Sequence, residues 1–111
     1  MKPQPYVRKK VKITFHARER LKERCKEFNS IDYINIATSA RYRGSKVEEL
    51  SKKERAWLKH HFNLRYRSSQ IRIYKDVIFI FAGNHSRTLI TVYKMPEFLK
   101  ESVENSKPIQ D

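Results

Sequence analysis

The sequence has few of the residues that mark several common protein classes. Its 111 residues include a single cysteine, Cys25, which excludes an internal disulfide and a cysteine-based metal cluster. A lone thiol fits a reducing compartment. No segment approaches the roughly 18 apolar residues of a membrane-spanning helix. The first twelve residues, MKPQPYVRKKVK, also lack the apolar stretch of a secretory signal. We therefore expect a cytoplasmic protein that does not associate with membranes.

Acidic residues are also scarce. The chain has 12 Asp and Glu against 25 Lys and Arg, which gives a net charge of +13 and a pI near 10.1. The basic residues are spread over most of the chain, which favours a charged folded surface over a charged tail. The positive electrostatic field of such a surface attracts polyanions. The composition therefore predicts a partner that is RNA, DNA or an acidic protein.

The length fits one domain, residues 1–111, with one modest core. Residues 1–10 contain two prolines followed by three basic residues, and we expect a flexible basic arm there. Residues 104–111 are polar, and we expect a frayed tail. No internal repeat, low-complexity segment or linker divides the chain.

Hydrophobic periodicity predicts an α+β fold. Val11–Phe15 alternates as a strand does, and His16–Phe28 has apolar residues at helical spacing. Further helices are expected up to Ala40 and over 47–62, with a three-stranded meander over 70–94. We therefore predict an N-terminal strand and two to three helices packed on one face of a curved antiparallel sheet of about four strands.

The meander has two chemically different faces if Lys75-Asp76 is a two-residue hairpin turn. One face is then aliphatic, and the helices should pack there: Ile71, Ile73, Ile78, Ile80, Ile90 and Val92. The other face is mixed: Arg72, Tyr74, Val77, Phe79, Phe81, Leu89, Thr91 and Tyr93. Aromatic and cationic side chains stack bases and contact phosphates, so the second face is the predicted RNA surface. Alternatively, Phe79 and Phe81 form a minor core under the N-terminal helix.

Two motifs resemble a known family. His16-Ala17-x-x-Arg20-x-x-x-Arg24 directly follows a short strand, and the last strand contains Ile-Thr-Val-Tyr, residues 90–93. Both resemble the small DUF4258-type proteins, which belong with the RelE-like toxins in the barnase/EndoU/colicin/RelE group. The helical stretch between Asn29 and Phe62 is longer than in the smallest members.

The resemblance implies a helical part packed on a curved sheet whose open face cuts RNA. It implies a metal-independent endoribonuclease of RelE-like toxin type that cleaves through attack of a 2′-hydroxyl and needs no cofactor. The implied partners are RNA, with ribosome association as one option, and an acidic antitoxin.

Metal-independent cleavage needs a base, an acid and cations around the phosphorane. His16 is the natural base or acid because its ordinary pKa lies near neutrality. Arg20 could hold a phosphate oxygen, and Arg72 offers a planar fork for phosphate. Tyr93 could donate a proton or stack a base. These four are the catalytic candidates, and His85 is a further acid or base.

Other basic and hydroxyl-bearing residues are candidates for nucleic-acid binding: Arg24, Arg41, Arg43, Arg65, Arg67, Tyr74, Arg87, Thr91 and Lys94. We interpret His60-His61 as structural charges at a helix end, because a metal there would need ligands that the spacing does not supply. Cys25 and Trp57 are expected in the core.

The charge supports two further functions equally well. One is a nucleic-acid-binding regulator of phage or plasmid type without catalysis. The other is a basic protein that binds and inhibits an acidic host protein.

Overall fold

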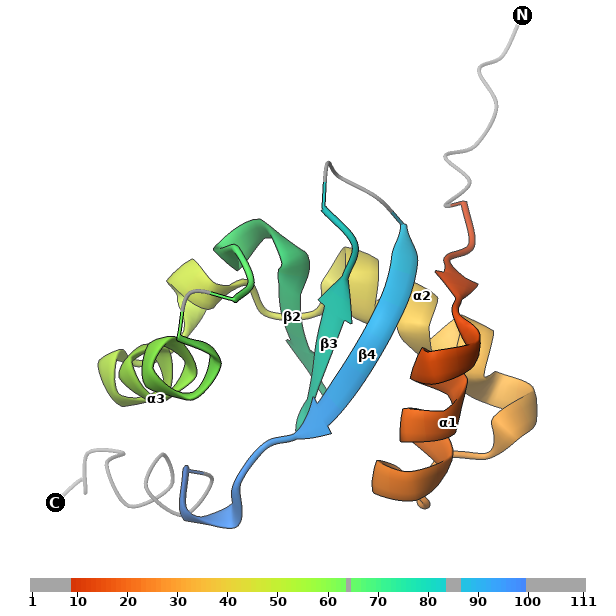
Figure 1. Ribbon diagram of the computed structural model, residues 1–111, viewed down its shortest axis with the longest axis horizontal. Coiled ribbons are helices and arrows are strands. Elements are labelled where there is room, and N and C mark those ends of the chain that lie inside the picture. Colours follow the sequence, from red (N-terminus) through yellow and green to blue (C-terminus); the bar gives the residue numbers. More distant parts are fainter. Residues whose placement is uncertain (1–8, 64, 84–86, 100–111) are drawn as a thin grey trace, which may run out of the picture.

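A four-stranded sheet lies at the centre of the protein (Figure 1). The computed structural model describes residues 9–63, 65–83 and 87–99. The strands are β1 (Lys12–Ile13), β2 (Ile71–Tyr74), β3 (Val77–Phe81) and β4 (Thr88–Lys94), in the spatial order β1-β4-β3-β2. β2, β3 and β4 form an antiparallel meander, and β1 pairs in parallel with β4. The predicted α+β class and the four strands are confirmed, but the sheet is mixed.

Three α-helices surround the sheet: α1 (Phe15–Arg24), α2 (Tyr33–Arg43) and α3 (Lys52–Phe62). The Thr14 hydroxyl caps α1 by accepting from the Ala17 amide at 3.0 Å. At α3, Ser51 accepts from the Glu54 amide at 3.1 Å, and Glu54 accepts from the Ser51 amide at 2.9 Å. None of the described helices is long and apolar enough to cross a membrane.

Three short 3₁₀ turns complete the described elements: Ser30–Asp32, Val47–Glu49 and Ser68–Gln70. Residues 47–62 were predicted as a continuous or slightly broken helix, and the broken form is found, with a 3₁₀ turn before the cap at Ser51 and α3 after it.

The core between the sheet and the pair α1 and α2 is the larger of two. It joins small and aromatic helix residues to one face of β3 and β4, including Ala17, Leu21, Cys25, Tyr33, Ala37, Val77, Phe79, Phe81, Leu89 and Val92. Cys25 is fully buried, as predicted, and this burial raises the pKa of its thiol to about 11.

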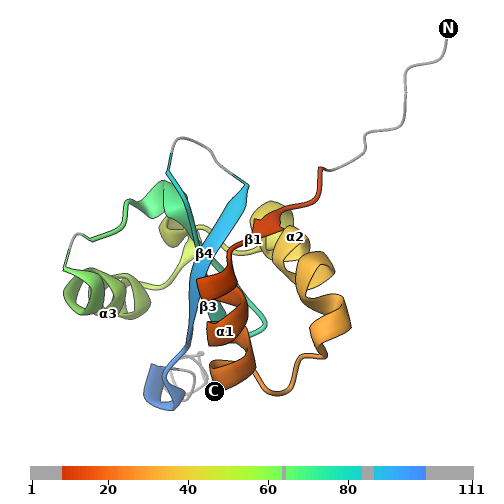
Figure 2. The same ribbon diagram turned by 45° about the vertical axis from the view of Figure 1, so that its right-hand side comes forward.

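The opposite face of the sheet is covered by α3 and by the segment after β4. Leu58, Phe62, Met95 and Leu99 pack there on Ile71, Ile78 and Ile80. Figure 2 shows α3 on one side of the strands and α1 and α2 on the other. The prediction that the helices pack on one face is therefore wrong. All five residues of β3 are buried, as expected of an apolar strand that is covered on both faces.

The register of β2 and β3 is as predicted. Tyr74 pairs with Val77 and Ile73 with Ile78. Lys75 and Asp76 form the two-residue turn with φ values of 52° and 63°, and positive φ at both positions is the geometry of a type I′ hairpin.

The register of β3 and β4 differs from the prediction because of a β-bulge. Phe81 pairs with Leu89 but Ile80 pairs with Thr91, so Ile90 is an extra residue in β4. Beyond it, every side chain of β4 changes face. Val92 therefore lies on the α1 and α2 side, and Tyr93 lies on the α3 side, opposite to the prediction.

The aromatic face expected to hold RNA is thus not open. Val77, Phe79, Phe81 and Leu89 are buried under α1 and α2, so the core expected as the alternative for Phe79 and Phe81 also includes Val77 and Leu89. Most of the arm predicted at residues 1–10 and all of the tail predicted at 104–111 lie outside the described residues, as does His85.

Candidate nucleic-acid interface

Five ring-bearing side chains gather where α3 meets the end of β4. We call this the aromatic cluster: Trp57, His61, Phe62, Tyr66 and Tyr93. Trp57 and His61 are one turn apart on α3, and their rings stack with centroids 4.5 Å apart at 11°. The ring of Tyr93 lies edge-on to both His61 and Phe62, at 6.0 and 5.1 Å. His61 is exposed, whereas Trp57, Tyr66 and Tyr93 are half-buried, so the cluster reaches the surface.

Arg24, in the last turn of α1, approaches the same cluster from the other side of β4. Its guanidinium carbon lies 4.9 Å from the centre of the Tyr93 ring, and its Nη1 donates to the Val92 carbonyl at 2.7 Å. Figure 1 shows α1 and α3 on opposite sides of β4. Since β1 pairs only with Thr88 and Leu89, Arg24 binds the part of the β4 edge that β1 does not reach.

Tyr66 links the cluster to a further cation. Its side chain is hydrogen-bonded to that of Tyr93 and interacts with Arg65. Burial raises the pKa of Tyr66 and the bond to Tyr93 raises it further, while Arg65 opposes the change. The Tyr66 phenol therefore stays protonated at neutral pH and can donate a hydrogen bond.

The four predicted catalytic residues do not lie together. Tyr93 is in the aromatic cluster. His16 is exposed in the first turn of α1, eight residues and thus about 12 Å along the helix from Arg24. Arg20, between them on the same stripe, pairs with Glu23 at 2.9 Å. Arg24, predicted only to bind nucleic acid, is the α1 residue that contacts Tyr93.

Arg72 lies in β2, two strands away from β4. Its Nη1 donates to the carbonyls of Ile71 and Ser69 at 2.9 and 3.2 Å. Burial lowers the pKa of its guanidinium, and the nearby Arg41 adds to this effect. Arg72 is thus held by backbone of its own segment, and β3 lies between its strand and the strand of Tyr93.

The predicted nucleic-acid-binding residues fall into several places. Arg65 lies beside Tyr66, and Lys94, at the end of β4, pairs with Glu27 at 2.7 Å. Arg67 is exposed in the segment before β2. Thr91 pairs with Ile80 in the sheet and is only 5% exposed, so it is a core residue.

The remaining candidates lie on the α2 side or near β1. Arg41 and Arg43 belong to the last turn of α2, and the Arg41 guanidinium carbon lies 6.0 Å from the centre of the Phe81 ring. Tyr74 packs against the α1 and α2 core with Lys75 over its ring. These three residues belong to a different surface from the aromatic cluster.

A strongly basic depression lies at the start of β4. It has a volume of about 320 Å³ and is lined by Lys9, Lys10, Lys12, Arg87 and Thr88. Lys12 and Thr88 are partners in the parallel pairing of β1 with β4, which brings the N-terminal lysines to Arg87. Four cations around one hollow concentrate positive potential and suit a phosphate.

Sequence reasoning missed three members of the aromatic cluster. His61 was interpreted as a helix-end charge and Trp57 as core, although their i,i+4 spacing indicates a stacked pair on one face of α3. Tyr66 lies in an irregular segment, and nothing in its local sequence indicates that its hydroxyl meets Tyr93.

Among the described residues, no group of three His, Cys, Asp or Glu side chains is placed to hold a metal ion. Comparisons with protein-family models, with curated proteins and with solved structures find no match for this chain.

Proposed function

We propose that this protein binds RNA at the surface formed by α1, β4 and α3, and cleaves it by attack of a 2′-hydroxyl without a metal ion. One observation carries the proposal: Tyr93 is contacted by the guanidinium of Arg24, the ring of His61 and the side chain of Tyr66. A cation, an imidazole and two phenols are the group types that such chemistry uses.

The proposed reaction assigns a role to each group. The His61 imidazole takes the proton of the 2′-hydroxyl, whose oxygen bonds to phosphorus. Arg24 stabilises the charge on the phosphorane oxygens. The bond to the 5′-oxygen then breaks, and Tyr93 gives that oxygen its proton. The products are a 2′,3′-cyclic phosphate and a 5′-hydroxyl. Proton transfer through water from the His61 imidazolium restores Tyr93.

RNA binding is supported by the exposed parts of the same surface. The stacked rings of Trp57 and His61 offer a flat platform for a base. Arg20 and His16 continue the Arg24 stripe along α1, and the net charge of +13 attracts the phosphate backbone. In this account His16 and Arg20 bind RNA beside the reaction centre.

We extend the proposal to the partner that the resemblance to RelE-like toxins implies. An acidic antitoxin would be attracted by the same charge and would block the α1–β4–α3 surface. Ribosome association is part of the same proposal, because it would present messenger RNA to this surface.

The second candidate is a nucleic-acid-binding regulator without catalysis. The observation that favours it is that Arg24 and Tyr93 already have protein partners, the Val92 carbonyl and Tyr66. In that case both residues would hold the surface in shape and the RNA would stay intact.

Growth upon expression separates the two candidates. His61→Ala and Tyr93→Phe should each relieve toxicity, whereas His60→Ala, which removes the neighbouring imidazole outside the aromatic cluster, should not. Equal toxicity of all three variants and the wild-type protein would reject the catalytic assignment. If the protein is a regulator without catalysis, RNA that co-purifies with the wild-type protein should be intact.

A further inference from the structure

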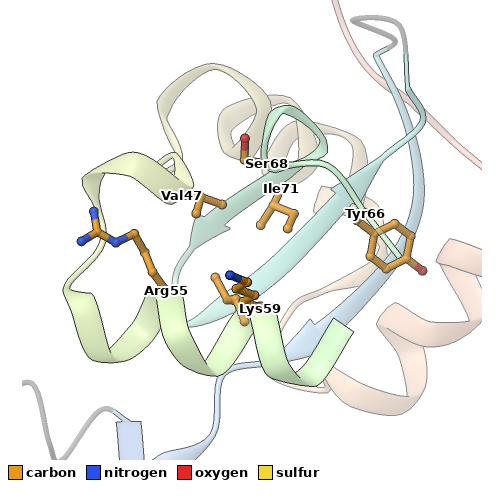
Figure 3. A pocket seen from close by; sticks show the side chains of 7 residues that line it. Val47, Arg55, Lys59, Tyr66, Ser68 and Ile71 are labelled. Carbon is orange, nitrogen blue, oxygen red and sulfur yellow. The ribbon is translucent and has the colours of Figure 1, made fainter. Parts of the chain in front are cut away.

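A small cavity lies beneath α3, on the α3 side of the sheet. Its volume is about 130 Å³, and it is lined by Val47, Arg55, Leu58, Lys59, Tyr66, Ser68 and Ile71. Figure 3 shows Arg55 at one end, Tyr66 at the other, and Val47 and Ile71 between them. Three successive segments thus build one hollow: the 3₁₀ turn at Val47–Glu49, α3, and residues 66–71.

The lining combines an apolar interior with cations. Val47, Leu58 and Ile71 offer aliphatic surface, and Tyr66 offers an aromatic ring. Arg55 and Lys59 are exposed, lie one helical turn apart on α3, and both line the cavity. Neither has an ion-pair partner among the described residues. The ligand should therefore have a flat apolar part and an anionic part.

The volume limits the apolar part to one small group. Cavities for drug-sized ligands have roughly 300–1,000 Å³. A cavity of about 130 Å³ holds a single ring system, while the charged part of the ligand stays at the mouth with Arg55 and Lys59.

The cavity adjoins the aromatic cluster through Tyr66. One residue contributes to both, because it lines the cavity and its side chain is also hydrogen-bonded to that of Tyr93. In Figure 3 the Tyr66 hydroxyl points away from Val47 and Ile71. A ligand in the cavity therefore lies directly behind the proposed reaction centre.

We propose that the cavity binds one base of the RNA chain, and that Arg55 and Lys59 bind the phosphate of that nucleotide. This inference rests on the proposed function, and it adds a nucleotide-binding subsite. The aliphatic walls and the Tyr66 ring contact the base. The subsite would hold one nucleotide out of the stack beside the bond that is cut.

The test is an NMR titration of the full chain with the four nucleoside 5′-monophosphates, the matching nucleosides and inorganic phosphate. At least one monophosphate should bind about tenfold more tightly than its nucleoside and than phosphate, because only the nucleotide uses both parts of the cavity. Shifts should centre on Leu58, Tyr66 and Ile71. Phosphate binding as tight as the nucleotides would show that only the two cations matter, and would overturn the inference.

Two variants act on the cavity in different ways. Arg55→Gln with Lys59→Gln removes the phosphate contacts, and Ser68→Leu fills the cavity from an exposed position. Each should weaken monophosphate binding about tenfold. Lys22→Gln with Lys53→Gln removes the same charge elsewhere and should change binding less than twofold. Unchanged binding in Ser68→Leu would overturn the proposed base site.

The outcome separates this inference from the proposed function. If Ser68→Leu binds and cuts RNA as the wild-type protein does while Tyr93→Phe does not cut, the subsite is wrong and the nuclease stands. If the wild-type protein binds a monophosphate in the cavity but leaves RNA intact, the subsite stands and the nuclease is wrong.

Discussion

Arg24 makes two contacts that a lysine cannot reproduce together. Its planar guanidinium donates to the Val92 carbonyl while it lies 4.9 Å from the centre of the Tyr93 ring. Arg24→Lys keeps the charge but loses this geometry. We expect the free energy of unfolding to fall by about 1 kcal/mol, and RNA cleavage to be lost while RNA binding is largely kept.

Urea unfolding and cleavage assays on the same Arg24→Lys preparation check this expectation. Lys22→Arg, on an exposed side of α1, is the matched control because it also exchanges one cation for the other. Full cleavage activity in Arg24→Lys would show that only charge is needed at this position, contrary to the proposed role.

Tyr66 gives the protein a defined alkaline pH dependence. Its pKa in the folded protein is raised above the ordinary value of 10.0, so the folded state holds this proton more tightly than the unfolded state. The contribution to stability is complete below about pH 10 and is lost as pH rises through the folded pKa. Tyr66→Phe should therefore lessen the fall in unfolding free energy above pH 10.

Urea unfolding between pH 8 and pH 11 measures this effect. Tyr74→Phe, on the α2 side of the sheet, is the matched control for removal of a phenol. An alkaline decline that is as steep in Tyr66→Phe as in the wild-type protein would show that the environment of Tyr66 does not resist its ionisation.

Single residues show where sequence reasoning succeeds and fails. Cys25 was predicted in the core from helical spacing alone, because an apolar stripe on an amphipathic helix must be buried. Tyr93 and Arg24 were both singled out, but not as neighbours. Their contact depends on how α1 lies along β4, a tertiary fact that no local pattern encodes.

Among the elements, β4 differs most from the expectation. The turn at Lys75 and Asp76 fixed the pairing of β2 with β3, since a two-residue hairpin leaves one register. The second turn could not fix the pairing of β3 with β4, because the bulge at Ile90 moves every later residue to the other face. Without that bulge, Tyr93 would lie under α1 and α2, away from His61.

The capping box at the start of α3 should stabilise this helix, and substitution of Ser51 tests that expectation. Ser51 and Glu54 form a reciprocal capping box, and α3 carries Trp57, His61 and three cavity residues. Ser51→Ala should lower the free energy of unfolding by about 1 kcal/mol. It should also speed amide hydrogen exchange in the first turn of α3.

Ser51→Asp is the conservative control, because aspartate is an equally good N-cap, and it should restore most of the stability. Equal stability of the alanine and wild-type proteins in urea would contradict the role assigned to this cap.

For the whole molecule, the predicted α+β class and four strands are confirmed, whereas the open sheet face is not. All five residues of β3 are apolar and buried, which is typical of a strand covered on both faces and leaves no open aromatic face. The proposed RNA surface is consequently not a sheet face. It is the α1–β4–α3 surface, where helices from both sides meet one strand.

Because the net charge is +13, we expect the affinity for RNA to fall as the salt concentration rises. For single-stranded RNA, the logarithm of the affinity should fall linearly with the logarithm of salt concentration, by about 0.7 for each phosphate contact. Arg24→Gln should reduce that slope by about 0.7. Fluorescence anisotropy with a labelled oligoribonucleotide measures it, and a slope near zero for the wild-type protein would exclude phosphate contacts as the basis of binding.

The most direct measurement for the central claim is the chemistry of the RNA ends. The purified protein is incubated with a mixed-sequence RNA, either free in excess EDTA or ribosome-bound in a magnesium buffer, and the products are analysed by mass spectrometry. We predict internal cuts that leave 2′,3′-cyclic phosphate and 5′-hydroxyl ends with the wild-type protein and with His60→Ala, but not with His61→Ala or Tyr93→Phe. The account would be contradicted if wild-type protein in molar excess bound both RNAs but left them intact.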